Sequence, residues 1–331
     1  MNKSVNTSMR RRAFLKNAGT AVAGSLLASA WPRLGRAQTP KFAKTPVFIG
    51  TTPQFSNVII GVERGFFLKE GLPVEITNFS SGAAAVDAFR TGNGGLVVAG
   101  DFPSLKVWSQ GGGIGICPQA SYDQLSLIVA KKSITKPQDL KGKKVGVLLG
   151  STSEYFIRLY LKTAGMEYAD IDPINLRPAE MVTGIVRGDI DAFVIWQPFG
   201  WTAERASPEV HILTTAKGFF HEWEMVTTTK AYAAAHPAEL VAFLKGLSAA
   251  GKWITENVDE AAKLVAASLR IDDVTVPRRM IELINWDISY TSSFRKDIDR
   301  LGEFLKIKPD WPAMFEPKFL AELGSSYVQP V

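Results

Sequence analysis

Residues Lys143–Gly165 read KKVGVLLGSTSEYFIRLYLKTAG. The segment Lys144–Leu149 is short and apolar and contains β-branched residues, which predicts a buried strand. Glycine and hydroxyl side chains at Gly150–Ser153 then interrupt the apolar run, as is typical of a turn that leads into a helix. Charged residues four apart follow, opposite an apolar face, until Gly165 can end the helix in the left-handed conformation. We therefore predict a strand, a hydroxyl-rich loop and a helix.

The loop Gly150–Ser153 is a candidate anion site. A helix start presents unpaired backbone N–H groups and the positive end of the helix dipole, and both favour a negative charge. Ser151, Thr152 and Ser153 would add hydroxyl donors. The alternative interpretation is that Ser151 or Thr152 only caps the helix.

The composition indicates a globular protein without a nucleic-acid partner. The chain has 331 residues, of which 46% are hydrophobic and 21% charged, which allows two domains of ordinary size. Its net charge of +6 comes from residues 1–37, which hold seven basic residues and no acidic one, whereas the remainder has 31 basic and 32 acidic residues. Residues 38–331 are thus close to neutral, and a basic surface for nucleic acid is not expected. Cys117 is the only cysteine, so no disulfide can form within the chain.

Residues 1–37 resemble a twin-arginine export signal. The segment Arg10–Lys16, RRRAFLK, contains the paired arginines followed by Phe, Leu and Lys, although the first arginine stands where Ser or Thr is usual. The weakly apolar segment Ala18–Trp31 is too short for a stable membrane span. Small residues at Gly35 and Ala37 predict cleavage after Ala37, with the mature protein in the periplasm. The alternative is a disordered or membrane-anchoring N-terminus.

Strands and helices alternate along the first part of the chain. We predict strands at residues 47–50, 74–79 and 96–99, each followed by a polar loop and a helix. This alternation predicts an α/β fold with a parallel, doubly wound sheet.

The same pattern starts again after Asp139. Strands are predicted at residues 145–149, 174–176, 191–196, 210–214 and 225–229. Beyond Thr229 the chain is predicted to be almost purely helical, with segments at 237–256, 258–269, 277–290 and 296–305.

A second α/β unit inserted into a first one predicts two lobes. Two chain crossings, near Leu125–Ala130 and Glu224–Thr229, would join a first lobe, residues 38–127 and 227–331, to a second lobe, residues 128–226. Polar loops that face each other across two lobes form a cleft.

Ligands of doubly wound sheets collect at the carboxyl ends of the strands, so the loops there supply the candidate ligand-binding residues. Aromatic side chains in these loops could wall in an organic ligand, or they could belong to the core. Asp101 could accept a hydrogen bond from the ligand, or cap the next helix. The candidates are Thr52, Gln54, Phe55, Ser80, Ser81, Gly82, Asp101, Phe102, Gly150, Ser151, Thr152, Ser153, Trp196, Gln197 and Trp223.

Four segments resemble, in order and at similar spacing, the solute-binding proteins of ABC importers for sulfonates, taurine, nitrate and thiamine precursors. They are Gly61–Val74 (GVERGFFLKEGLPV), Asp139–Val147 (DLKGKKVGV), Gly188–Ala192 with Trp196–Pro198 (GDIDA and WQP) and His236–Pro237 (HP). The resemblance covers roughly residues 45–260.

The resemblance implies a periplasmic binding protein fold of type II. Two doubly wound lobes with a helical C-terminal tail would close on a small-molecule ligand by a hinge motion, and an ABC permease in the inner membrane would be the partner. It also implies a small organic anion, sulfonate or carboxylate, with its acid group at the helix after Gly150. One departure bears on specificity: relatives that bind taurine carry an acid where this chain has Gln197.

The sequence predicts binding without catalysis. It contains no G-x-S-x-G elbow, phosphate loop or dinucleotide fingerprint, so no cofactor is expected. His211, His221 and His236 do not have metal-ligand spacing, so no metal site is expected either. A monomer is expected. The alternatives are import of a thiamine-precursor pyrimidine or nitrate, or an enzyme or sensor domain that uses the same fold.

Overall fold

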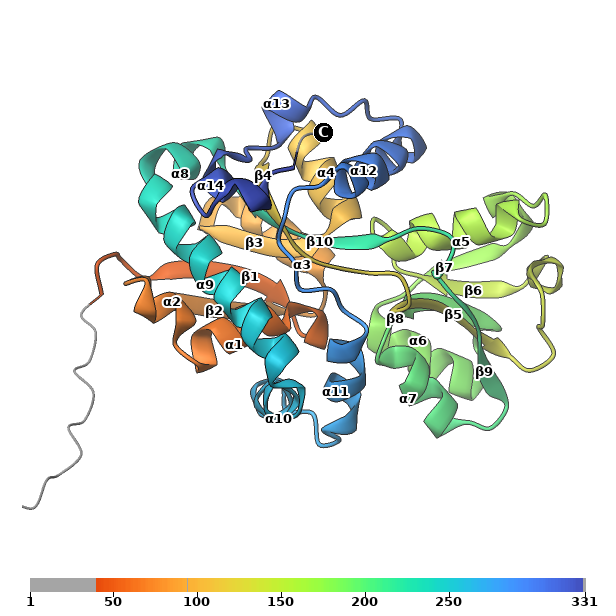
Figure 1. Cartoon of the computed structure of the whole chain (residues 1–331). Coiled ribbons are helices and arrows are strands. Elements are labelled where there is room, and N and C mark those ends of the chain that lie inside the picture. Colours follow the sequence, from red (N-terminus) through yellow and green to blue (C-terminus); the bar gives the residue numbers. More distant parts are fainter. Residues whose placement is uncertain (1–39, 94, 330–331) are drawn as a thin grey trace, which may run out of the picture. The chain divides into compact units, whose positions relative to one another are not determined.

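The computed structural model describes residues 40–93 and 95–329 (Figure 1). The predicted export signal, residues 1–37, lies outside these ranges. Helices cover both faces of two separate five-stranded sheets. No helix in the described ranges is both long and apolar enough to cross a membrane.

The first sheet has a single strand that runs against the others. Its strands lie in the order β2 (Val74–Phe79), β1 (Thr45–Gly50), β3 (Leu96–Gly100), β10 (Glu222–Thr228) and β4 (Ile114–Tyr122). Strand β1 pairs in parallel with β2 and β3, whereas β10 is antiparallel to both β3 and β4.

The second sheet repeats this arrangement. Its strands lie in the order β7 (Asp172–Asn175), β6 (Lys144–Val147), β8 (Ala192–Trp196), β5 (Ser126–Lys131) and β9 (Val210–Thr215). Strand β6 is parallel to β7 and β8, and β5 is antiparallel to β8 and β9.

Both sheets are therefore mixed: the alternating strands are parallel as predicted, and one strand in each sheet, β10 or β5, runs against them. The reason is the crossing of the chain between sheets: β5 follows β4 into the second sheet, β10 follows β9 back into the first, and both crossing strands enter antiparallel. Because they run against their neighbours, β5 and β10 begin at the edge where the parallel strands end. Strand β5 begins at Ser126 and β10 at Glu222, a few residues before the expected lobe boundaries.

The helices follow the alternation that the sequence predicts. Those around the first sheet are α1 (Ser56–Glu63), α2 (Phe66–Lys69), α3 (Gly82–Ala88) and α4 (Asp101–Ser109), and those around the second are α5 (Thr152–Lys162), α6 (Pro178–Arg187) and α7 (Phe199–Ala206). The C-terminal part contains α8 (Lys230–Ala235), α9 (Pro237–Glu256), α10 (Val258–Leu269), α11 (Thr275–Glu282), α12 (Ser292–Leu305), α13 (Trp311–Met314) and α14 (Lys318–Ala321).

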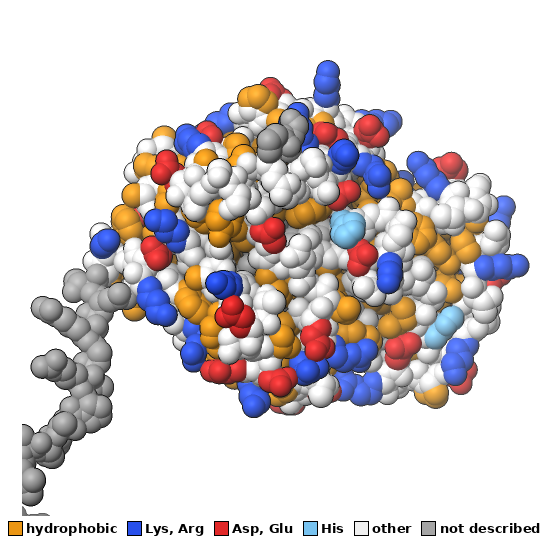
Figure 2. Space-filling model, in the orientation of Figure 1, with side chains coloured by type: hydrophobic (Ala, Val, Ile, Leu, Met, Phe, Trp, Pro, Cys, Tyr) orange, Lys and Arg blue, Asp and Glu red, His pale blue; other side chains and the backbone are white. Residues whose placement is uncertain are grey.

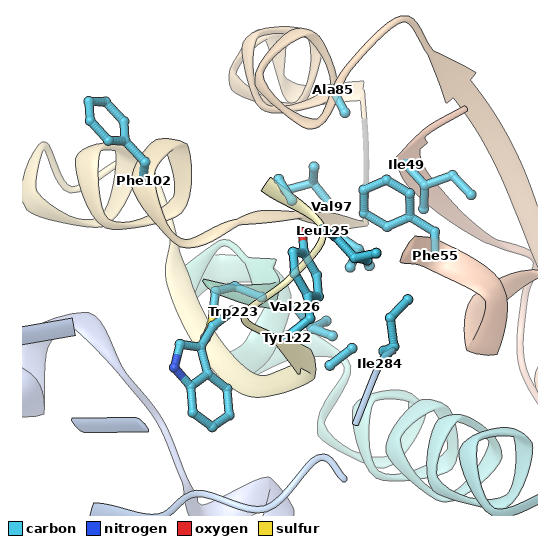
Figure 3. Packing of buried hydrophobic residues seen from close by; sticks show 14 of the residues in the cluster. Ile49, Phe55, Ala85, Val97, Phe102, Tyr122, Leu125, Trp223, Val226 and Ile284 are labelled. Carbon is cyan, nitrogen blue, oxygen red and sulfur yellow. The ribbon is translucent and has the colours of Figure 1, made fainter. Parts of the chain in front are cut away.

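A buried phenylalanine explains part of the GVERGFFLKEGLPV motif. The ring of Phe67 stacks on Phe243 of α9 with 4.9 Å between centroids. A Cβ atom at Gly61 or Gly246 would lie 2.2 Å or 2.4 Å from this ring. Glycine at both positions therefore lets α1 and α9 enclose Phe67. Other members of the same core, including Ile49, Val97 and Val226, are shown in Figure 3.

The predicted helix at residues 277–290 was wrong in its second half. Helix α11 ends at Glu282, and the chain then pairs with the edge of the first sheet instead: Asn285 and Ser121 exchange two backbone hydrogen bonds of 2.9 Å. The next helix begins at Ser292, because the Thr291 side chain caps the N–H of Phe294.

The C-terminal segment contacts helices of the second sheet. The guanidinium of Arg279 in α11 lies 3.9 Å from the centroid of Trp201 in α7, and Arg205 pairs with Asp273 at 3.1 Å. On α12, the ring of Phe304 lies 4.8 Å from Tyr155 of α5. These contacts tie the two sheets together outside the crossings.

Candidate functional site

One pocket is lined by loops and strand ends from both sheets. Its volume is about 400 Å³, counting the part open to solvent, and about 30 Å³ of it is accessible to water molecules. A volume of 30 Å³ has room for about two water molecules. The lining residues are Thr52, Gln54, Phe55, Ser81, Gly82, Ala83, Gly100, Pro103, Tyr122, Ser151, Thr152, Trp196, Glu222 and Glu224.

The topology explains why these residues meet. The loops after β1, β2, β3 and β6 leave the carboxyl ends of parallel strands, which share one edge of a sheet. Strand β10 is antiparallel, so its first residues lie at the same edge: Glu224 is in register with Gly100 at the end of β3, and Glu222 with Tyr122 at the end of β4.

Side chains at the start of α5 already accept hydrogen bonds from some of its backbone N–H groups. The Ser151 hydroxyl accepts a hydrogen bond from the N–H of Ser153 at 3.2 Å and donates to the carbonyl of Leu148 at 2.7 Å. The N–H of Gly150 donates to Glu154 at 3.1 Å. The capping interpretation therefore holds for the Ser151 side chain. The backbone N–H groups of Ser151 and Thr152 have no acceptor within the part of the chain that the structure describes, and these two groups remain available to an anion.

Asp101 connects the two sheets beneath the pocket. Its Oδ1 atom accepts hydrogen bonds from the N–H of Phe102 at 2.7 Å and from the Thr152 hydroxyl at 3.1 Å, and its Oδ2 atom accepts one from the N–H of Trp223 at 3.3 Å. Burial raises the pKa of Asp101 to about 7, although these hydrogen bonds act in the opposite direction.

Two glutamates of β10 form an acidic wall of the pocket. Glu222 and Glu224 are 3% and 4% exposed. The Glu224 Oε1 atom accepts a hydrogen bond of 2.8 Å from the Tyr122 hydroxyl, and Glu222 accepts one from Ser126. The Glu224 Oε2 atom is buried and has no hydrogen-bond partner among residues 40–93 and 95–329.

Burial and mutual repulsion alter the protonation of this wall. Burial raises the pKa of Glu224 to about 8; the Tyr122 hydrogen bond opposes this change and the charge of Asp101 adds to it. The pKa of Glu222 lies well above its ordinary value, first because of burial and then because of Asp101. No lysine or arginine of the described ranges lines the pocket, so no fixed cation compensates the three carboxyl groups.

Two further polar atoms at the pocket lack partners. The Nε1 atom of Trp196 and the Oε1 atom of Gln54 are buried, and the described residues offer neither of them a hydrogen bond. The ring of Phe55 completes this side and packs closely on Gly50, where a Cβ atom would lie 2.7 Å from it. The pocket thus combines an aromatic wall with unsatisfied polar groups, as ligand sites commonly do.

Eight of the candidates from the sequence line this pocket: Thr52, Gln54, Phe55, Ser81, Gly82, Ser151, Thr152 and Trp196. The remaining seven, Ser80, Asp101, Phe102, Gly150, Ser153, Gln197 and Trp223, do not line it. Asp101 lies directly behind it, since it accepts the Thr152 hydroxyl.

The aromatic candidates that do not line the pocket belong to the core. Phe102 points away from Phe55 (Figure 3), and its ring lies 6.4 Å from Phe304. Trp223 alternates with the two glutamates along β10 and therefore faces the other side of the sheet. There its Nε1 atom donates to Asp297 at 3.0 Å, and its ring meets the edge of Phe294.

Local hydrogen bonds and burial account for the other candidates. Gln197 accepts the N–H of Trp201 at 3.1 Å and so supports the first turn of α7. The N–H of Gly150 donates its hydrogen bond to Glu154. Ser153 is fully buried, and Ser80 is exposed. Arg177, two residues after the end of β7, pairs with Glu180 on the surface.

Sequence reasoning missed Glu222, Glu224 and Tyr122, together with Ala83, Gly100 and Pro103. A signal for the glutamates exists: two acids two residues apart, at the start of an apolar run, place both side chains on one face of a strand. Among residues 40–93 and 95–329, the acidic wall included, no group of His, Cys, Asp and Glu has the arrangement of a metal site. On the face drawn in Figure 2, basic and acidic side chains are interspersed, and neither sign dominates.

The pattern that defines the NMT1/THI5-like family matches residues 52–261. The taurine-binding periplasmic protein of Escherichia coli K12 is 30% identical over 218 residues, which cover 61% of this chain and 67% of that protein. A putative aliphatic sulfonates-binding protein of Bacillus subtilis 168 is 27% identical over 242 residues, covering 69% and 71%. The alkanesulfonate-binding protein SsuA of Xanthomonas axonopodis pv. citri, solved with MOPS bound, superposes with a TM-score of 0.71 at 18% identity, over 83% of this chain and 99% of that one; at this identity the likeness concerns the fold.

Proposed function

Because the chain belongs to the NMT1/THI5-like family, we propose that it is the solute-binding component of an ABC importer and binds a small organic acid, sulfonate or carboxylate, in the pocket between its two sheets. Its relatives include proteins named for binding taurine and aliphatic sulfonates. The membrane permease of the importer would be its partner.

The observation that carries this proposal is the start of α5 at the pocket. The N–H groups of Ser151 and Thr152 have no acceptor among the described residues, and both residues line the pocket. A helix of 11 residues directs its dipole at the same place. An acid group bound there would accept both hydrogen bonds without a basic side chain.

Binding on this proposal requires the two lobes to move. Residues 38–127 with 227–331 form one lobe and residues 128–226 the other. The volume accessible to water is about 30 Å³, which is too small for an organic acid to enter without opening. Hinge rotation at the crossings before β5 and β10 would open the pocket, and closure would bury the ligand.

Export would place this protein in the periplasm. The twin-arginine motif in Arg10–Lys16 and the small residues at Gly35 and Ala37 support cleavage after Ala37. Sequencing the N-terminus of protein isolated from the periplasm should give Gln38 as the first residue. Material that begins at Met1 would contradict the proposed signal.

A binding protein returns its ligand unchanged. We expect a monomer that needs no cofactor and converts no ligand. The alternative is an enzyme or a sensor domain that uses the same fold, and product analysis distinguishes the enzyme from the binding protein.

The test uses the mature chain, a panel of small acids and one pyrimidine. Melting curves and calorimetry with ethanesulfonate, propionate, nitrate, bicarbonate and an aminopyrimidine would identify the class that binds. We expect an organic acid to raise the melting temperature and to reduce the radius of gyration in X-ray scattering. Binding of the pyrimidine alone, or release of a product, would overturn the proposal.

A further inference from the structure

We propose that Glu222 and Glu224 form a second subsite, which binds an ammonium or similar N–H donor of the ligand. The ligand class is then a short amino-sulfonate or amino-carboxylate. This inference rests on the proposed function for the acid end of the ligand and adds the recognition of its other end.

The first line of evidence is an unsatisfied acceptor. Glu224 is 4% exposed and lines the pocket, and within the described chain its Oε2 atom has no hydrogen-bond partner. A buried carboxyl oxygen without a donor is costly, and such atoms are rare in folded proteins. The other oxygen is already held by Tyr122 at 2.8 Å, so the side chain is fixed with its free atom available to a ligand.

The second line is the charge balance of the pocket. Glu222, Glu224 and Asp101 are all buried, and the lining of the pocket includes neither lysine nor arginine from the described ranges. Neighbouring buried carboxylates destabilise one another unless a proton or a cation lies between them. A ligand ammonium would supply three N–H donors and the missing positive charge.

The third line is the distance to the proposed acid site. Glu224 is in register with Gly100, and a Cβ atom at Gly100 would lie only 3.2 Å from the Oγ1 atom of Thr152. The start of α5 and the acidic wall are therefore near neighbours across Gly100. One short molecule can reach both, which excludes long-chain amines from this class.

The chain lacks an acid at Gln197, where the resemblance places one in taurine-binding relatives. The Gln197 side chain is committed to the N–H of Trp201. In this chain the acids that face the pocket come from β10 of the other sheet. The subsite that binds the ligand's N–H donor is thus assigned to Glu222 and Glu224 of the first sheet, and not to position 197 of the second sheet.

The experiment compares ligands that differ only in the ammonium group. Calorimetry would measure taurine against ethanesulfonate, and β-alanine against propionate, with ethylammonium as the cation alone. The variants are Glu224→Gln and Glu222→Gln, which keep the side-chain shape. Asp297→Asn is the matched control, because this carboxyl holds Trp223 on the opposite face of β10.

We expect the parent protein to bind each amino-acid member of a pair more tightly than its partner. Glu224→Gln should weaken taurine or β-alanine binding by about 10- to 100-fold and leave the simple acids unaffected, since one charge-assisted hydrogen bond is lost. Asp297→Asn should preserve the preference. Glu222→Gln provides a second test if Glu224→Gln fails to fold.

Each other outcome separates the two proposals. Equal affinity within each pair, or an equal loss for both members in Glu224→Gln, overturns the donor subsite and leaves the acid site standing. Binding of ethylammonium alone, lost in Glu224→Gln, overturns the acid site and supports the donor subsite. If no member of the panel binds at millimolar concentration, both are wrong.

Discussion

The hydroxyl of Thr152 donates a hydrogen bond of 3.1 Å to the Oδ1 atom of Asp101. Thr152 is the first residue of α5, which packs on the second sheet, and Asp101 is the first residue of α4, which packs on the first sheet. This bond therefore joins the two sheets at the pocket, which Thr152 lines. It exists only while the starts of the two helices are close together.

Thr152→Val should favour the open arrangement. The substitution keeps the side-chain volume but removes one of the three donors to Asp101. A hydrogen bond of this kind contributes about 0.5–1.5 kcal/mol, so closure should become roughly 2- to 10-fold less favourable. X-ray scattering of the ligand-free variant should give a larger radius of gyration than the parent. Superimposable curves would show that the bond does not hold the lobes together.

Ser151→Ala should lower stability without much effect on binding. The Ser151 hydroxyl caps the N–H of Ser153 and is itself bonded to Leu148, so it has no free donor for a ligand. Loss of a helix cap costs about 1 kcal/mol. Thermal unfolding and calorimetry on the same sample would measure both effects. A large loss of affinity at unchanged stability would mean that the hydroxyl binds the ligand after all.

The acidic wall predicts that the ligand-free protein becomes less stable as the pH rises. Burial raises the pKa of Asp101 from 3.8 to about 7 and that of Glu224 from 4.5 to about 8. A raised pKa means that the folded state holds its proton more strongly than the unfolded state. The resulting stability is fully present below the unfolded pKa values and is lost as the pH rises through about 7 and 8.

The slope should reach about 1.4 kcal/mol per pH unit for each such group. Glu222, Asp101 and Tyr122 surround Glu224, and all of them remain in Glu224→Gln. That variant should therefore lose less of its free energy of unfolding between pH 5 and pH 8 than the parent, by the contribution of one group. Denaturant unfolding at several pH values measures the difference. Parallel stability curves for the two proteins would contradict the assignment.

The sequence was sufficient to predict that the loops after the parallel strands lie at the pocket. The loops at Thr52, Ser81 and Ser151 meet because the carboxyl ends of parallel strands share an edge, and that edge follows from the alternation of strands and helices. The acidic wall was not predicted, because Glu222 and Glu224 stand at the start of a strand. Residues at the start of a strand lie at the edge where the parallel strands end only if their own strand is antiparallel. Whether a strand that follows a chain crossing pairs in this way is set by tertiary contacts.

The sequence also did not predict the direction of each side chain relative to the pocket. Trp223 lies between the two glutamates, and the alternation along β10 sends it to the opposite face. Phe102 follows Asp101 in the first turn of α4, yet its ring belongs to the core beside Phe304. A residue's position in a loop at the carboxyl ends of the parallel strands thus predicts that it lies near the pocket. Whether it lines the pocket depends on the direction of its side chain.

Thr152→Pro should show whether the backbone of α5 binds the acid. Proline removes the N–H of residue 152 and is well tolerated at the first position of a helix. The preceding residue, Ser151, has φ −122° and ψ 169°, an extended conformation that a following proline permits. The variant should therefore fold with little change in melting temperature.

Thr152→Val is the matched control for this proline, since both variants lack the hydroxyl and only Thr152→Pro also lacks the N–H. If the N–H binds the acid group, Thr152→Pro should bind ethanesulfonate about 10- to 100-fold more weakly than Thr152→Val, because a hydrogen bond to a charged group is worth about 1.5–3 kcal/mol. Calorimetry on the two variants side by side gives this ratio. Equal affinities would exclude the Thr152 N–H as a receptor and leave the acid to other groups of the pocket.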